Sequence, residues 1–403
     1  MKIALLVTVC LLLFTSCSPA SPYPTDDTYH FETDSQYTFY TQAGFRNFAE
    51  AENGYYFTLT INGFSYIFFT DKETMQTIPL CSKPNCLHYN EKDSEQRALC
   101  NAYISGLDYE AAIFYTNQKV YTFQNQNDSH FDLIELTPDG TSRKTAISLS
   151  SLKNSYTGDG VVIHRGHLYL LTSYYDENRN TEINIWQYSL DKPESKPKSI
   201  YTLTRKDSPV AMDLKAFGNH LYFMIWDGTM SYYQVDVRNA KVTQIFDIAQ
   251  VQSPEIYDQN FNIAILGTTL INELIHMDMS APNNSATFST IYTANLDGSH
   301  IQKWIEVEND PYTADQKYFY RWTMWSGGKL LSESPHIRIY NKEGDLLVDH
   351  DPLQDIPDYR DIYVSPGEHV FIYSPQKVYY FSKEEIETGE IHPKLLIDCS
   401  STS

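Results

Sequence analysis

The sequence predicts an all-β protein, a β-propeller with seven four-stranded blades, on three observations. Tyr and Phe are abundant, at 32 and 20 of 403 residues, and aromatic side chains favour the pleated, half-buried surface of a strand. Short β-patterned runs recur in groups of four, and seven such groups follow one another at a spacing of about 45–55 residues, as propeller blades do. Asp139-Gly140, Asp297-Gly298 and Glu343-Gly344 each fall between the third and fourth run of a group, and these dipeptides favour tight hairpin turns. Six or eight blades are the alternatives.

The seven groups are expected at residues 48–81, 110–150, 160–204, 212–249, 260–308, 317–351 and 360–399. A four-stranded sheet cannot bury both of its faces alone, and radial repetition gives each sheet a neighbour on either side. In the sixth group the runs are expected at 317–329, 330–335, 336–344 and 345–351. An extended segment from Tyr37 to Tyr40 is a candidate strand for closing the ring on the last blade.

The N-terminus predicts export. Met1-Lys2 is followed by an apolar run, Ile3 to Phe14, that is too short for a stable membrane-spanning helix. Phe14-Thr15-Ser16-Cys17 resembles the lipobox of bacterial lipoproteins, which implies cleavage before Cys17 and lipid attachment to it. We therefore expect a signal peptide at 1–16, a lipidated cysteine and flexible spacer at 17–35, and one propeller domain at 36–403, held at the extracytoplasmic face of a cell membrane. An ordinary signal peptide with an incidental Cys17 is the alternative.

The charge balance excludes one class of partner. Asp and Glu outnumber Lys and Arg by 51 to 30, for a formal net charge of −21. Such a surface repels nucleic acid and anionic lipid headgroups. Residues 18–35 are rich in Ser, Pro, Thr and Asp, which is typical of a flexible linker.

The loop after the first group holds Cys81, Cys86, His88 and Cys100. Three thiolates and one imidazole form a ligand set that tetrahedral zinc accepts. A disulfide is the competing interpretation, because exported chains form them, with Cys399 as a candidate partner, and free thiols are a third. We expect a structural role in each case, since acidic residues crowd the loop whereas a catalytic thiol needs an electropositive setting.

Two short segments carry a family resemblance. The residues LCSKPNCLH, followed by CNAY, resemble a segment of lipoproteins from Gram-positive gut bacteria whose function is unknown and whose bodies are similar to the propeller of low-density-lipoprotein-receptor-type proteins. Degraded copies of the receptor-type Tyr-Trp-Thr-Asp signature occur at Phe68-Phe69-Thr70-Asp71 and Phe114-Tyr115-Thr116-Asn117. The resemblance implies a surface-anchored binding or scaffold propeller with no assigned activity.

Ligands of propellers usually bind at the face that carries the connections between second and third strands and between blades. On that face the sequence places Tyr174, Tyr175, Trp226, Asp227 and Tyr312, and the aromatic rings among them could stack on a sugar or a peptide. The sequence contains no HExxH, no P-loop and no dinucleotide glycine fingerprint. We therefore expect a binding module for a glycan, peptide or partner protein. A propeller glycoside hydrolase or lyase that uses loop carboxylates, such as Asp355, Asp358 and Asp361, is one alternative, and a non-catalytic envelope scaffold is the other.

Overall fold

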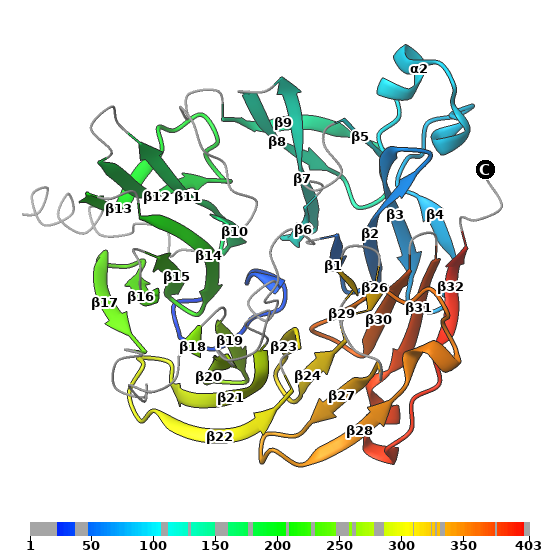
Figure 1. Cartoon of the computed structure of the whole chain (residues 1–403). Coiled ribbons are helices and arrows are strands. Elements are labelled where there is room, and N and C mark those ends of the chain that lie inside the picture. Colours follow the sequence, from blue (N-terminus) through cyan, green and yellow to red (C-terminus); the bar gives the residue numbers. More distant parts are fainter. Residues whose placement is uncertain are drawn as a thin grey trace, which may run out of the picture.

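The structure is a computed structural model, and it describes residues 22–36, 47–105, 112–127, 130–149, 160–175, 180–206, 209–226, 230–246, 258–259, 263–277, 286–308, 310–323, 325–326, 329–330, 335–374 and 377–398. Over these residues seven antiparallel sheets of four or five strands stand around a common axis (Figure 1). The predicted seven-bladed β-propeller is thus confirmed. No helix among the residues described is long and apolar enough to cross a membrane.

The first four blades follow the chain in order from the inner strand to the outer one. Their strands are β1 (Phe48–Glu50), β2 (Gly54–Ile61), β3 (Phe64–Asp71) and β4 (Thr77–Pro79), with β5 (Tyr103–Ile104) added on β3; β6 (Ile113–Thr116), β7 (Lys119–Asn127), β8 (His130–Leu136) and β9 (Arg143–Ser148); β10 (Val161–His164), β11 (His167–Tyr175), β12 (Thr181–Ser189) and β13 (Lys198–Arg205); and β14 (Val210–Phe217), β15 (His220–Trp226), β16 (Met230–Asp236) and β17 (Lys241–Ile245).

The last three blades repeat this order. They contain β18 (Asp258–Gln259) with β19 (Ile263–Leu266), β20 (Thr269–Met277), β21 (Ala286–Asn295) and β22 (Gln302–Val307); β23 (Tyr312–Ala314), β24 (Phe319–Trp322), β27 (Ile337–Tyr340) and β28 (Leu346–His350); and β29 (Asp361–Val364), β30 (His369–Ser374), β31 (Lys377–Ser382) and β32 (Lys394–Asp398). A small hairpin, β25 (Trp325–Ser326) and β26 (Lys329–Leu330), interrupts the sixth blade.

The tight turns between third and fourth strands lie where the dipeptides predict them. Gly140, Gly298 and Gly344 have φ values of 67°, 79° and 92°, a left-handed conformation that costs glycine nothing. The register of the sixth blade differs from the prediction. Its first strand is β23, which the sequence interpretation places in a crossover, and its second is β24, which lies inside the run expected to come first. Residues 331–334 of the expected second run lie outside the described residues.

Side chains between neighbouring blades form the core. Tyr56 of β2 stacks on Tyr115 of β6 with ring centroids 5.9 Å apart, and Phe371 of β30 contacts Phe48 and Tyr55 of the first blade at 5.0 and 4.8 Å. These last contacts close the ring. The seventh blade already has four strands of its own, and Tyr37–Tyr40 lies outside the described residues, so its predicted pairing stays a prediction.

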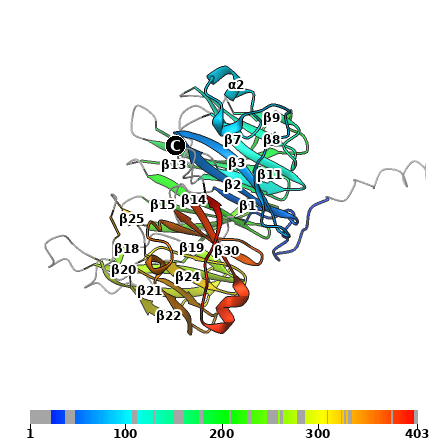
Figure 2. The ribbon, with the colours of Figure 1, turned by 90° about the vertical axis from the view of Figure 1, so that its right-hand side faces the viewer.

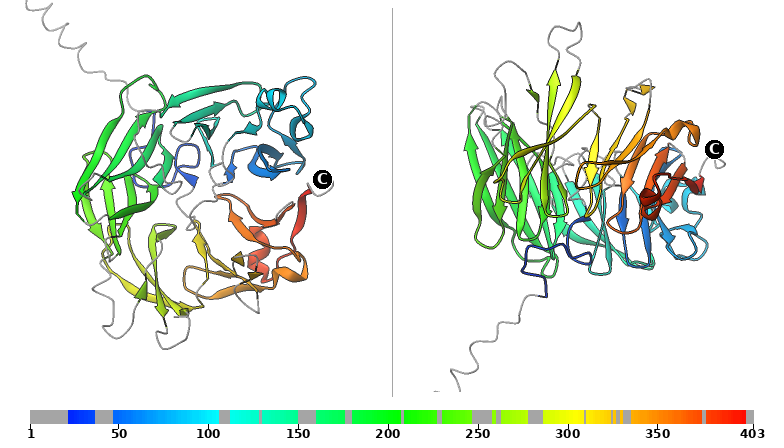
Figure 3. Two further views of the ribbon diagram at one scale, coloured as in Figure 1. Left: turned by 45° about the horizontal axis from the view of Figure 1, so that its top comes forward. Right: turned by 90° about the horizontal axis from the view of Figure 1, so that it is seen from below.

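The propeller has two distinct faces. We call the face with the turns between first and second strands and between third and fourth strands the turn face, and the opposite one the loop face. Residues 22–36, here named the N-terminal strap, lie against the turn face, while β20 and β21 project at the loop face (Figures 2 and 3). The strap bonds to the turns at Asn117, Arg165 and Asn219. Over residues 22–35 the structure therefore differs from the flexible spacer that composition predicts.

Candidate functional site

The cysteine loop (residues 81–100) joins the first blade to β5. It contains a short 3-10 turn, η2 (His88–Asn90), and one helical turn, α2 (Ser94–Ala98). Asp93 caps α2 by accepting bonds of 2.9 Å from the backbone N–H groups of Glu95 and Gln96, as an N-cap aspartate does. The chain then returns to the sheet, where β5 pairs with the start of β3. The loop is thus a closed excursion with both ends anchored on one blade.

The four predicted side chains of this loop come together. One ligand atom from each of Cys81, Cys86, His88 and Cys100 lies within 4.8 Å of the others. The Sγ of Cys100 is 3.7 Å from Nδ1 of His88, and the three cysteines are free thiols. Cys81 and Cys100 are buried, while Cys86 and His88 are half-buried. Cys17 and Cys399 lie outside the described residues.

The surroundings give these groups different proton affinities. Burial raises the pKa of Cys81, but hydrogen bonds from the backbone N–H groups of Lys83 and Asn101 and from the neighbouring thiols outweigh it, so the net pKa is lowered. Burial and the charge of Cys81 raise the pKa of Cys100 to about 12. Burial also lowers the pKa of His88. The surroundings therefore favour a neutral imidazole at His88 and make Cys81 the more acidic of the two buried thiols.

The cysteine loop lies on the outer rim of the ring, where α2 stands outside β3 and β5 (Figure 1). The hairpin turn of the second blade supports it there: the carbonyl of Gly140 accepts bonds from Nδ2 of Asn101 at 2.8 Å and from the N–H of Ser82 at 3.4 Å. From there β5 carries the chain along the edge of the first blade.

Aromatic side chains are exposed at the loop-face ends of three consecutive blades. Tyr174 ends near the tip of β11 and is 45% exposed, and Trp226 ends β15 and is 47% exposed. Phe288, near the start of β21, is 38% exposed and stacks on His276 at 4.1 Å. Sequence reasoning missed Phe288, because it lies inside an alternating run and only the strand's end exposes it. Tyr175 ends β11, but its side chain, like all of Asp227, lies outside the described residues.

Tyr312 is not part of this exposed surface. Its side chain is fully buried in β23, and the guanidinium of Arg321 lies 5.8 Å from its ring centroid. The expectation that Tyr312 lines a ligand face is corrected by the register of the sixth blade. The sequence interpretation places Tyr312 in a crossover between blades. The structure places it in β23, the inner strand of the sixth blade, where its side chain is buried.

A carboxylate–histidine group lies on the loop face between the fifth and sixth blades. Glu308, Asp310 and His336 offer ligand atoms within 4.8 Å of one another, and Nε2 of His336 is 3.1 Å from Oδ2 of Asp310. Arg338 lies 3.3 Å from Glu308 and balances its charge. The hydroxyl of Thr323 is 3.4 Å from Nδ1 of His336, but Thr323 is fully buried. A buried hydroxyl cannot reach a substrate, so this group does not form a nucleophilic triad.

The turn face carries a pocket of about 330 Å³ between the sixth and seventh blades. Both lysines that line it pair with carboxylates. Nζ of Lys383 lies 2.5 Å from Oδ2 of Asp315 and 2.6 Å from the carbonyl of Ser365, and Lys317 pairs with Glu387. Both lysines of the pocket are therefore engaged by carboxylates at this junction between blades.

Comparisons with known proteins identify the fold. No family model matches the chain, and no curated protein matches it. Among solved structures, a prolyl endopeptidase is 12% identical with a TM-score of 0.55, covering 92% of this chain and 51% of its own. Puromycin hydrolase is 8% identical with a TM-score of 0.54, covering 93% and 56%. The chain thus spans about half the length of these proteins, and its likeness to them is that of a shared propeller fold.

Proposed function

We propose that this protein is a membrane-anchored extracytoplasmic lipoprotein whose propeller is a binding module for a peptide, glycan or partner protein. The observation that carries the proposal is the row of exposed Tyr174, Trp226 and Phe288 at the loop-face ends of three adjacent blades. Large aromatic rings are unfavourable in water and gain free energy by stacking on a flat ligand. They are the exposed aromatic side chains among the residues that the structure describes, and we name them the aromatic row.

The N-terminal strap supports an orientation for this surface. In the proposed mature chain the lipid would be on Cys17, and Pro22, the first residue of the strap, follows it by five positions. A chain of that length reaches at most about 18 Å. The turn face, to which the strap is bound, would therefore face the membrane, and the aromatic row would face outward. Mutation of Cys17 to Ala should release the protein from the membrane fraction, and retention of that variant would contradict the anchor.

The proposal favours binding over hydrolysis for a physical reason. The carboxylates described at the loop face between the fifth and sixth blades are engaged: Glu308 with Arg338, and Asp310 with His336. A glycosidase needs two carboxyl groups free to flank one bond. Two of the solved structures with this fold are a prolyl endopeptidase and puromycin hydrolase, which makes peptides the first ligand class to screen.

The test is a screen of the full-length protein in detergent against peptide and glycan arrays, followed by titration of any hit. The triple variant Tyr174→Ala, Trp226→Ala, Phe288→Ala should weaken binding at least tenfold, because each stacked ring contributes about 0.5–1.5 kcal/mol. A matched control is Ile78→Ala with Leu395→Ala. These two side chains are even more exposed, at 59% and 52%, but they lie on outer strands.

Three outcomes would overturn the proposal or replace it. An equal loss of ligand binding in the control variant would show that the ligand adheres non-specifically to exposed apolar side chains. Array ligands that are turned over by the wild-type protein would establish the hydrolase or lyase alternative. Capture of neighbouring envelope proteins alone, unaffected by the triple variant, would establish the scaffold alternative.

A further inference from the structure

We propose that the cysteine loop binds one zinc ion through Cys81, Cys86, His88 and Cys100, and that this ion holds the loop folded on the rim of the propeller. The site is independent of the aromatic row, so either proposal can fail without the other.

The spacing of the ligand atoms fits a tetrahedral metal. With bonds of about 2.3 Å to sulfur and about 2.0–2.1 Å to nitrogen, the edges of a zinc tetrahedron measure about 3.4–3.8 Å. The Cys100 Sγ to His88 Nδ1 separation of 3.7 Å already has this length, and all four atoms lie within 4.8 Å of one another. Metal binding thus needs contraction by about an ångström at most. A disulfide needs two sulfurs at about 2.05 Å and leaves the third thiol and the imidazole without a role.

The backbone around the cluster is arranged for thiolate ligands. The N–H groups of Lys83 and Asn101 point at the sulfur of Cys81, and that of Ala102 points at the sulfur of Cys100. Such donors orient the ligating sulfurs as outer-shell partners do in metal sites. His88 is held with φ of 51°, a left-handed conformation that strains a non-glycine residue. This conformation directs Nδ1 at Cys100, so ligation would offset the strain.

The charge of the site is also matched. Zinc with three thiolates and a neutral imidazole carries a net charge of −1. Arg143 lies beside Cys100, where its guanidinium donates to the carbonyl of Asn101 at 3.1 Å. A cation next to a thiolate-rich site lowers the cost of its burial.

The loop has few other packing contacts, the main one being half-buried Tyr89, whose ring lies 6.4 and 6.0 Å from those of Tyr66 and Phe68. Between Ser82 and Leu99 the only buried side chain is that of Arg97, which lies over the ring of Phe64 at 3.7 Å. A segment of this length with one buried side chain gains too little from burial to offset its loss of conformational entropy. Structural zinc supplies folding free energy in small loops of this kind. Thiolate and imidazole ligands with no carboxylate in the set exclude Ca²⁺ and Mg²⁺ and favour zinc.

The primary test is metal content of the full-length protein in detergent, purified without reductant or chelator. We expect one zinc per chain by elemental analysis. Replacement by Co²⁺ should give the absorption of tetrahedral cobalt together with sulfur-to-cobalt charge transfer. Alkylation mapped by mass spectrometry should leave Cys81, Cys86 and Cys100 unmodified in the native protein and modify all three after chelation. This readout is specific to the loop and does not depend on Cys17 or Cys399.

Variants distinguish ligands from neighbours. Cys86→Ser, whose site is half-buried, should lose zinc and the cobalt spectrum, and His88→Ala should shift the cobalt bands or lose metal. Ser82→Ala in the same loop and His392→Ala on an exposed turn should bind zinc as the wild type does. Trypsin should cut after Lys92 and Arg97 of the wild-type loop at least tenfold faster once zinc is removed.

Two results would overturn the proposal. One is protein without metal in which two of the three loop cysteines resist alkylation after unfolding until reductant is added, because these would be joined in a disulfide. The other is protein without metal in which all three thiols react, with Co²⁺ giving no thiolate charge transfer.

Discussion

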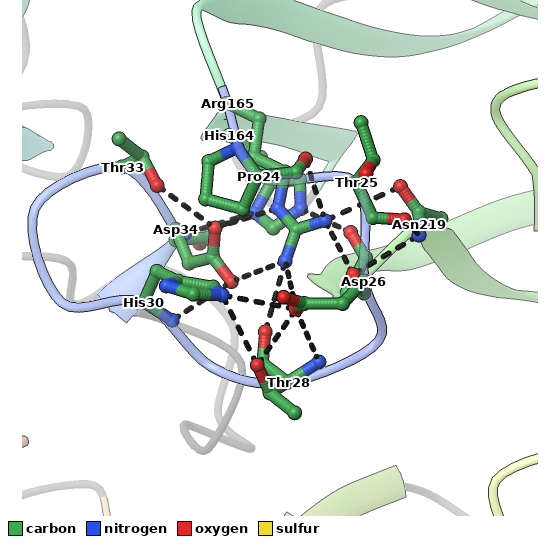
Figure 4. A network of polar contacts seen from close by, with 12 residues as sticks. Pro24, Thr25, Asp26, Thr28, His30, Thr33, Asp34, His164, Arg165 and Asn219 are labelled. Atoms are coloured by element: carbon green, nitrogen blue, oxygen red, sulfur yellow. Dashed lines mark hydrogen bonds and ion pairs between the residues drawn. The ribbon is translucent and has the colours of Figure 1, made fainter. Parts of the chain in front are cut away.

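Arg165 and Asp34, 131 residues apart in the chain, form a buried two-point ion pair that binds the N-terminal strap to the third blade. Nε of Arg165 lies 2.8 Å from Oδ1 of Asp34, and Nη2 of the same guanidinium lies 3.1 Å from Oδ2. The same guanidinium donates to the carbonyls of Pro24, Asp26 and Thr28 (Figure 4). Almost every N–H donor of the Arg165 guanidinium thus binds the N-terminal strap.

Replacement of Arg165 by Ala should release the strap. The change leaves Asp34 buried without its partner, which costs about 3–5 kcal/mol when a buried pair is broken. Arg165→Lys should be intermediate, because lysine keeps the charge but not the fork of donors. Hydrogen exchange of residues 22–36, together with urea unfolding, measures both effects. Arg238→Ala is the control: this exposed residue makes a similar contact to Asp236 and should change nothing. Protection of the strap in Arg165→Ala would contradict the assigned role.

The strap should also loosen in mild acid through His164. Burial lowers the pKa of His164 to about 4, below the value of about 6.5 expected in the unfolded chain. In the folded protein its neutral ring accepts the N–H of Ser35 at 3.0 Å through Nδ1, while Nε2 donates to the carbonyl of Gly218 at 2.7 Å. The folded state therefore excludes a proton that the unfolded state binds. This contribution is complete above about pH 6.5 and is lost as the pH falls toward about 4.

Between about pH 7 and 5 this single group should account for about 2 kcal/mol of the fall in unfolding free energy. The measurement is urea unfolding at several pH values in wild type and in His164→Gln. Burial lowers the pKa values of His167, His220 and His369 as well, so the wild-type slope includes their share, and the difference between the two proteins isolates His164. Identical slopes would show that His164 does not titrate with unfolding.

Most of the fold could be predicted because its determinants are local. Alternation with a period of two and tight-turn dipeptides are short-range signals, and they place six of the seven blades in register. The predicted register of the sixth blade is wrong because β23 is only three residues long and the hairpin of β25 and β26 interrupts the blade. A short strand carries too little periodicity to be distinguished from a loop. Tyr312, assigned to an exposed surface, was misplaced for the same reason.

The cysteine cluster, the N-terminal strap and the aromatic row differ in how readily the sequence predicts them. The cysteine cluster could be predicted because all its members lie within twenty residues and carry rare chemistry. The position of the N-terminal strap on the turn face could not be predicted, because its composition is that of a linker. The strap is bound there by Arg165, a residue far away in the sequence. Tyr174 and Trp226 were found as aromatic residues at strand ends, whereas Phe288 requires knowledge of where β21 begins.

The turn at Gly140 should be more sensitive to substitution than the turn at Gly63. Both glycines have positive φ, at 67° and 77°, so an alanine costs about 1–2 kcal/mol at either position. A Cβ at Gly63 meets nothing within 4 Å, whereas one at Gly140 would lie 2.6 Å from backbone atoms of Leu80. Gly140→Ala should therefore cost about 1–3 kcal/mol more than Gly63→Ala.

Because Leu80 precedes Cys81, the displaced backbone should also lower the zinc content of Gly140→Ala. Gly63→Ala serves as the matched control and should keep its zinc. Unfolding curves and elemental analysis of the two variants provide the comparison, and equal stability would show that the turn of the second blade does not press on the cysteine loop.

Closure of the ring should depend on Glu50, which joins three segments at the end of β1. Its carboxylate accepts the N–H of Gly367 from the seventh blade at 2.8 Å and pairs with Lys72 at 2.6 Å, while its backbone bonds to the side chain of Gln36 at the end of the strap. Glu50→Ala removes the buried partner of both Lys72 and Gly367 and should cost about 3–5 kcal/mol. Glu50→Gln should cost less, because an amide can still accept from Gly367.

The measurement that separates ring opening from general destabilisation is hydrogen exchange resolved by blade. In Glu50→Ala, β1, β2, β29 and β30 should lose protection first, because the first and seventh blades meet through side chains such as Tyr55 and His369, whose hydroxyl and ring nitrogen lie 2.7 Å apart. The third and fourth blades should be unaffected at low denaturant. Glu306→Ala, which breaks an exposed pair with Lys303, is the control and should leave every blade protected. Uniform loss of protection around the ring would place the weak point of the propeller elsewhere.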